Sequence, residues 1–293
     1  MGSSPSSRAG ALLDRLRGPS PLVAVELRPP RSGLSSDESI DSWIDMQHEV
    51  RRLAAQDIIM FLTDNAVGQA EEENLRHLTT NLAHEIHASR VVPFLTCKHS
   101  LDYCLMYAAR AASFGYEALT VLGGDKFVGA PRCTEHAYKL RVMIRDRVPS
   151  LALGGWANPH RDPARQVDFL LEEGYSAEFY LTQIVSHHQM PAVEGFVNEA
   201  ARRSVPIPGV FGVFYYRSAN PKTLARLSQF LPVPAEGIAK DFDVGLRAEE
   251  ICAMTINALR GVGIAKVYVS NLGFRGAARR YQGIMEMLGD GPS

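Results

Sequence analysis

Residues 117–125, with the sequence EALTVLGGD, join an apolar, β-branched run to a glycine pair and a carboxylate. This pattern predicts a buried strand that ends by presenting Asp125, because glycine permits positive φ and lets a flat ligand approach the backbone closely. An ordinary strand-to-helix turn, in which Asp125 only caps a helix, explains the same pattern. The functional interpretation gains weight because a polar residue at the end of a strand recurs in the surrounding units.

The whole chain alternates apolar strand patterns with amphipathic helical patterns, with a repeat of roughly 30 residues. This alternation predicts a single (β/α)8 barrel of the α/β class over residues 19–290, preceded by a flexible tail at 1–18. A doubly wound open sheet would require a glycine fingerprint after the first strand, and residues 27–30 (LRPP) contain none. Strands are expected at residues 22–28, 57–62, 91–95, 117–122, 151–155, 177–184, 207–213 and 265–270.

Polar residues cluster where active sites of such barrels lie, at the carboxyl ends of the strands. These residues, from five different units, are Glu26, Thr63, Asp125, His160 and Gln183. Glu26 lies inside an apolar run, where a carboxylate is costly unless it is protonated, paired or used. A Glu paired with a neighbouring Arg inside the barrel is the alternative to a functional Glu26.

Composition and charge exclude several classes of partner. A formal net charge of −1 argues against nucleic acid or an anionic membrane as partner. No apolar run approaches the roughly 20 residues of a membrane span. The four cysteines form no CxxC pair, which suits a reducing, cytoplasmic environment. His187 and His188 suggest a metal pair, but adjacent residues on a helix do not share a face, so we expect no metal site.

Six short motifs in the expected order resemble the methylenetetrahydrofolate reductase family, over residues 22 to 288. Each of them is weak evidence alone, and their shared order is strong evidence. They are residues 25–30 (VELRPP, compared with the family's FEFFPP), 94–97 (FLTC, HLTC), 122–125 (LGGD, LRGD), 181–183 (LTQ, ITQ), 208–210 (PGV, PGI) and 266–271 (KVYVSN, HFYTLN).

The resemblance implies reduction of 5,10-methylenetetrahydrofolate to 5-methyltetrahydrofolate by NADH or NADPH. Glu26 matches the family's catalytic acid. Opening the aminal ring needs a carboxyl that is still protonated near neutral pH, and burial in an apolar strand raises a carboxyl pKa. Asp125 matches the carboxylate beside the flavin and pterin. It should stay ionised and stabilise the iminium cation that forms when the ring opens.

The substrate-binding residues follow from the same resemblance. Gln183 matches a folate-contacting amide and can both donate and accept hydrogen bonds, although a satisfied core amide is equally consistent with its sequence. Tyr216 falls near an aromatic residue that packs on the folate's aminobenzoyl ring. Phe214 or Tyr215 takes that part if the alignment shifts, and all three are also suited to packing at a barrel rim.

FAD is the cofactor that the resemblance implies, with contacts from Thr63, Trp156 and His160. The departures from the family concentrate on this cofactor: Gly123 replaces an Arg, Phe94 replaces a His, and residues 64–65 (DN) replace a Tyr-Gly pair. A flavin dinucleotide brings a pyrophosphate that needs cations or a helix N-terminus. We therefore expect weak or absent flavin binding, with hydride passing directly from nicotinamide to folate.

Two other functions fit the same residues. A barrel that binds folate without turnover is favoured by the altered flavin motifs and disfavoured by the retention of both Glu26 and Asp125. Another folate-dependent one-carbon enzyme, such as a methyl transferase, is the second alternative. The sequence predicts no particular oligomeric state.

Overall fold

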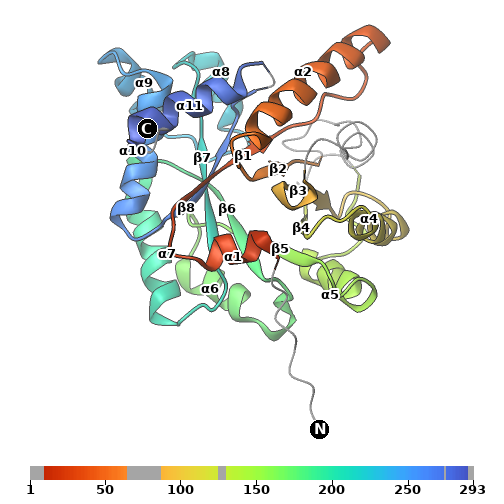
Figure 1. Ribbon diagram of the computed structural model, residues 1–293. Coiled ribbons are helices and arrows are strands. Elements are labelled where there is room, and N and C mark those ends of the chain that lie inside the picture. The colour runs from red at the N-terminus through yellow and green to blue at the C-terminus, as the bar shows by residue number, and fades with distance from the viewer. Residues whose placement is uncertain (1–9, 65–86, 125–129, 274, 290–293) are drawn as a thin grey trace.

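Eight parallel strands close into a barrel, with neighbours in sequence order from β1 to β8 and β8 paired to β1 (Figure 1). The computed structural model describes residues 10–64, 87–124, 130–273 and 275–289. The predicted (β/α)8 barrel is confirmed. The strands are β1 (Leu22–Leu27), β2 (Met60–Leu62), β3 (Val91–Thr96), β4 (Ala118–Leu122), β5 (Ala152–Ala157), β6 (Phe179–Val185), β7 (Gly209–Phe214) and β8 (Lys266–Ser270).

Helices surround the barrel (Figure 1). Asp162 caps the helix that starts at Pro163 by accepting a 2.8 Å hydrogen bond from the Arg165 amide. Leu75, Leu78, Leu82 and Ile86, which are spaced as on one face of a helix, lie outside the described residues. The described helices are α1 (Ala11–Arg17), α2 (Ser36–Ala54), α4 (Leu101–Ser113), α5 (Ala137–Arg147), α6 (Pro163–Leu171), α7 (Met190–Arg202), α8 (Pro221–Leu227), α9 (Ala235–Asp243), α10 (Ala248–Gly261) and α11 (Ala277–Leu288), with short 3-10 helices η2 (Ala88–Arg90), η3 (Glu173–Tyr175) and η4 (His187–Gln189).

The strands bury both faces, which explains their nearly continuous apolar sequences. One set of alternate residues packs against the helices, and the other set fills the barrel interior. Aromatic rings occupy much of that interior: Phe61 lies 6.1 Å from Phe94 and 5.9 Å from Tyr268, measured between ring centroids. The barrel is therefore a packed core that supports a site above it.

Two glycines in strands make room for these rings. A Cβ on Gly154 would lie 2.6 Å from the Phe179 ring, and one on Gly212 would lie 2.6 Å from the Tyr268 hydroxyl oxygen. Tyr268 uses the space to donate a 2.6 Å hydrogen bond to the Thr182 carbonyl. The missing side chains thus allow large rings to fill the barrel interior.

The amino-terminal segment departs from prediction. Residues 11–17, expected to belong to a flexible tail, form α1, and its Leu12, Leu13 and Leu16 are buried in the same cluster as the barrel interior. The physical reason is the burial of three leucines, which outweighs the polar character of the surrounding sequence. Residues 1–9 lie outside the described part of the chain.

Thr134 lies ahead of α5 but does not cap it. The helix begins at Ala137, with His136 at the cap position and no side-chain cap. The Thr134 hydroxyl lies 3.2 Å from the His136 carbonyl and 3.4 Å from the Cys97 sulfur.

Candidate active site at the carboxyl end of the barrel

The carboxyl ends of β1 and β8 bring Glu26 and Ser270 together. Val25 and Val269 pair in register and both face the helices, so the residues that follow them face the barrel interior. The Ser270 hydroxyl donates a 2.5 Å hydrogen bond to Glu26 Oε1. Sequence reasoning identified Glu26 but missed Ser270, whose contact with Glu26 arises from the pairing of β8 with β1.

Burial decides the protonation behaviour of Glu26. The surrounding protein raises the pKa of this carboxyl above its usual value, because removal from water disfavours the charged form. The Ser270 hydrogen bond and the positive charge of Arg28 act in the opposite direction but are smaller influences. An arginine therefore does influence Glu26, as the alternative interpretation expected, yet burial outweighs it. The group is suited to hold a proton.

Gln183 lies near the carboxyl end of β6, two residues after the buried Leu181 of the interior cluster. Its Oε1 accepts a 2.9 Å hydrogen bond from the Ile184 amide, at the point where the β6–β7 register shifts. Its Nε2 makes no hydrogen bond to any residue in the described part of the chain. Gln183 is half-buried, so its amide N–H groups are available to a ligand at the barrel mouth.

The three consecutive aromatic residues at the end of β7, which begin with its last residue Phe214, separate onto two faces. Tyr215 packs in the outer core, and its hydroxyl donates a 2.5 Å hydrogen bond to Glu249 on α10. Phe214 and Tyr216 pack together with ring centroids 4.9 Å apart, in a cluster that includes Ile184. Alternation therefore leaves Phe214 and Tyr216, and not Tyr215, on the side of the barrel mouth.

The three residues expected to contact a flavin occupy different environments. Thr63 is buried, and its amide donates to the Leu27 carbonyl at 3.0 Å. Trp156 is partly buried against the interior cluster. His160 Nε2 lies 2.8 Å from the Ile184 carbonyl and donates to it, which ties the loop after β5 to β6. Asp125, the second predicted catalytic carboxylate, lies outside the described residues.

Asp64, two residues after β2, contacts hydrogen-bond donors that could also bind an anion. One carboxylate oxygen accepts hydrogen bonds from the Thr96 amide at 2.7 Å and from the Thr96 hydroxyl at 2.9 Å. His99 Nε2 lies 2.8 Å from the same oxygen. These groups lie beside Thr63, where the family resemblance places flavin contacts. The protein's own carboxylate occupies these donors, so Thr96 and His99 do not offer them to a flavin pyrophosphate.

Arg132 was missed by sequence reasoning. Its guanidinium packs against Gly123, where a Cβ would lie 2.9 Å from Arg132 Cζ, and it donates a hydrogen bond to the Gly124 carbonyl. A cation therefore does lie beside the position where the family motif has arginine. No short-range signal links these residues, because the glycine creates the space and a distant side chain fills it.

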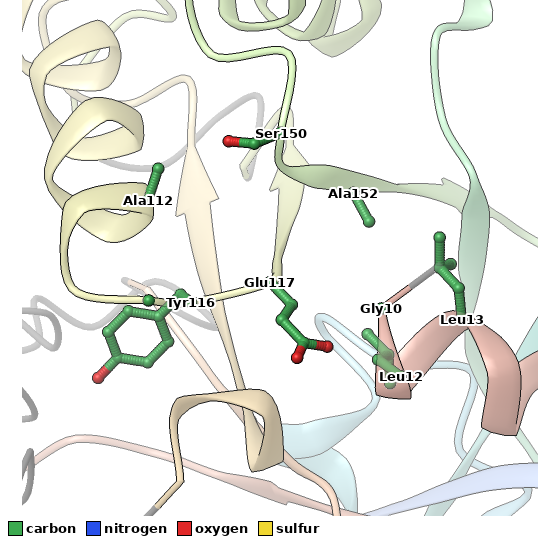
Figure 2. A pocket seen from close by; sticks show the side chains of 9 residues that line it. Gly10, Leu12, Leu13, Ala112, Tyr116, Glu117, Ser150 and Ala152 are labelled. Atoms are coloured by element: carbon green, nitrogen blue, oxygen red, sulfur yellow. The ribbon is translucent and has the colours of Figure 1, made fainter. Parts of the chain in front are cut away.

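The cavity in Figure 2 lies at the opposite end of the barrel from Glu26. Its volume is about 300 Å³, and its walls come from α1 and from the segments that precede β4 and β5. Figure 2 shows the Glu117 carboxylate directed towards Gly10 and Leu12, at the start of α1. In such barrels the amino ends of the strands serve stability, so we place the candidate site at the carboxyl ends.

A second polar cluster joins η4 to α9. His188 Nε2 lies 2.8 Å and His187 Nε2 lies 3.2 Å from the same oxygen, Oδ2 of Asp241. Burial and the neighbouring His188 lower the pKa of His187. The premise used against a metal pair is therefore wrong: η4 is a tight 3-10 turn, and the two imidazole centroids lie 4.0 Å apart.

Comparisons with known proteins support the fold. No protein-family model matches the chain, and no curated protein matches it in sequence. Among solved structures, an uncharacterized protein from Clostridium thermocellum that binds two copies of 5-methyl-5,6,7,8-tetrahydrofolic acid is similar, with a TM-score of 0.66 and 14% identity over 92% of this chain and 96% of that one. Two mandelate oxidase variants are similar with TM-scores of 0.50 and 0.51, at 12% and 11% identity, over 91% of this chain and 70% of theirs.

Within the described residues, the search for long apolar helices found none that could cross a membrane.

Proposed function

We propose that this protein reduces 5,10-methylenetetrahydrofolate to 5-methyltetrahydrofolate, with NADH or NADPH as the hydride donor. The observation that carries the proposal is the position of Glu26 at the carboxyl end of β1, where removal from water raises the pKa of its carboxyl. The similar folate-binding protein gives independent support, because it uses the same fold over nearly the whole chain to hold the product of this reaction.

The chemistry needs one proton and one hydride. Glu26 donates its proton to N10 of the folate, the C–N10 bond of the five-membered ring breaks, and an N5 iminium cation forms. The reduced nicotinamide then transfers hydride to the methylene carbon, which gives the N5-methyl product and the oxidised nicotinamide. Glu26 regains a proton from solvent before the next turnover. Ser270 holds Oε1 through its hydroxyl and so fixes the direction of the carboxyl group.

The folate is held by groups around Glu26. Gln183 directs its amide N–H groups at the pterin, and Phe214 or Tyr216 packs on the aminobenzoyl ring. Asp125 stabilises the iminium cation, as the family resemblance implies. Direct transfer from nicotinamide is favoured over transfer through FAD, because Asp64 already occupies the donors near Thr63. Trp156 and His160 then line the region that receives the nicotinamide.

Folate binding without turnover is the second candidate function. It is favoured by the comparison, since the similar protein from Clostridium thermocellum binds a folate. The two functions differ in one measurable respect: only the enzyme couples nicotinamide oxidation to the folate.

Glu26→Gln tests the proposal directly. We expect purified wild-type protein, without added flavin, to oxidise NADH or NADPH only when methylenetetrahydrofolate is present. The Gln variant should lose about 10²- to 10⁴-fold in turnover, because it keeps the shape of Glu26 but has no proton to donate. Binding of 5-methyltetrahydrofolate, measured by calorimetry, should persist in the variant. Wild-type turnover in the variant would exclude Glu26 as the acid.

The absorption spectrum of the purified protein tests the cofactor. We expect no flavin bands. A yellow chromophore near one equivalent per chain would exclude direct hydride transfer, and folate binding with no nicotinamide oxidation in wild-type protein would favour the binding protein instead.

A further inference from the structure

We infer that His187, His188 and Asp241 form a binding site for a divalent transition-metal ion of the zinc class. Each residue offers one ligand atom, and these atoms all lie within 4.8 Å of one another. Two imidazole nitrogens and one carboxylate oxygen are a common ligand set for Zn²⁺, and three protein ligands leave a fourth position for water. The site is separate from the proposed folate chemistry and does not depend on it.

The distances suit coordination. Bonds of about 2.0–2.1 Å to a tetrahedral zinc ion place neighbouring ligand atoms about 3.3 Å apart. Asp241 Oδ2 lies 3.2 Å from His187 Nε2 and 2.8 Å from His188 Nε2. An ion therefore requires only a few tenths of an ångström of adjustment between the carboxylate and each ring.

A hydrogen bond between Nδ1 of His187 and the Thr255 hydroxyl leaves the Nε2 lone pair of His187 for a metal ion. Thr255 Oγ1 donates to the Ile251 carbonyl at 3.3 Å and lies 2.8 Å from His187 Nδ1. With its own proton directed at that carbonyl, the hydroxyl accepts from Nδ1–H. The lone pair of the neutral ring is then on Nε2. A partner of this kind on the second ring nitrogen is the usual way in which proteins orient a metal-binding histidine.

The contact between His187 and Asp241 suits a bound cation. His187 Nε2 is buried and lies 3.2 Å from Asp241 Oδ2, with no well-aligned hydrogen bond between the two atoms. When Nδ1 carries the ring proton, Nε2 and Oδ2 are two facing acceptors that repel, and a buried carboxylate also needs a compensating charge. A metal ion between them satisfies both groups. His188, which can donate to Asp241 in the absence of metal, then binds through Nε2 and carries its proton on Nδ1.

The surrounding elements keep the three ligands in place. Gly237 on α9 allows the His188 ring to approach, because a Cβ there would lie 2.6 Å from the ring. Asp241 is on the same helix, while His187 and His188 come directly after β6. A bound ion would therefore join α9 to the carboxyl end of β6.

Metal titration of the untagged full-length protein tests the site. After chelator treatment and dialysis, we expect wild-type protein to bind one equivalent of Zn²⁺ and to give the visible absorption of tetrahedral Co²⁺ with Co²⁺. Asp241→Asn, which keeps the shape of the side chain, should lose that equivalent. His136→Gln is the matched control, since His136 is an exposed histidine with 57% of its side chain accessible, and it should retain full binding.

A second pair of variants separates ligation from folding. Thr255→Val removes only the hydroxyl that orients His187 and should weaken Zn²⁺ binding about 10- to 100-fold, whereas Thr255→Ser should bind like wild type. Wild-type protein that binds no Zn²⁺ would overturn the inference whatever the variants do. So would equal binding by wild type and a folded Asp241→Asn variant, with folding judged by circular dichroism.

Discussion

At the scale of single residues, the pKa of the Glu26 carboxyl is set by opposing influences. Burial raises it, while the Ser270 hydroxyl, which donates to Oε1, and the positive charge of Arg28 lower it. In the proposed reaction, Ser270 is a positioning residue, because it contacts Glu26 and not the folate.

Ser270→Ala should move the basic limb of the pH–rate profile to higher pH. The proposed reaction uses protonated Glu26, so turnover falls as pH rises through the pKa of this carboxyl. Removing the hydroxyl removes an interaction that favours the carboxylate, which raises the pKa further and extends activity upward. Ser270→Thr keeps the hydroxyl and is the control. A limb that stays in place in the alanine variant, or moves to lower pH, would contradict the role given to Ser270.

At the scale of elements, α1 covers the amino end of the barrel and packs against its interior. Its leucines belong to the same buried cluster as Phe61 and Tyr268 of the barrel interior. The cavity in Figure 2 lies beside this helix, so α1 does not fill the amino end of the barrel completely. The helix is therefore part of the folded barrel and contributes to its stability.

Leu13→Ala should lower the free energy of unfolding by about 2–5 kcal/mol, the usual cost of truncating a buried leucine. Leu13 is 1% exposed, whereas Leu171, at 36% exposed, is the matched control and should lose much less on the same change. Urea unfolding followed by circular dichroism measures both. Equal losses at the two positions would mean that α1 does not support the barrel.

At the scale of the whole molecule, the two ends of the barrel have different roles. The amino end carries α1 and a cavity, while the carboxyl end carries Glu26, Gln183 and the cluster of His187, His188 and Asp241. The glycines of β5 and β7 allow rings to fill the space between them. Ligand binding at one end should consequently stabilise the entire barrel.

Thermal unfolding with 5-methyltetrahydrofolate tests this arrangement. At a ligand concentration of 100 times Kd, we expect the folded state to gain about 2.7 kcal/mol, seen as a raised Tm. Gln183→Leu should reduce the shift, because it removes the amide that faces the barrel mouth. Glu117→Gln, in the cavity at the amino end, should leave it unchanged. A Tm shift that is reduced by Glu117→Gln and not by Gln183→Leu would place the folate at the amino end of the barrel and contradict the proposed site.

The sequence by itself determined the barrel. Strand and helix periodicity depends on nearby residues, and the carboxyl ends of parallel strands meet at one edge, so Glu26 and Gln183 could be placed at the carboxyl ends of β1 and β6 from the sequence. The helix at residues 11–17 was missed because its leucines matter only once they enter the barrel interior.

Only the tertiary structure decided the contacts between residues that are distant in the chain. Ser270 meets Glu26 because β8 closes on β1, and Arg132 fills space left by Gly123. Asp241 reaches both histidines because α9 packs over η4, whose tight turn brings adjacent rings to the same side. Such contacts depend on how the chain packs in three dimensions, and local sequence patterns carry no record of that packing.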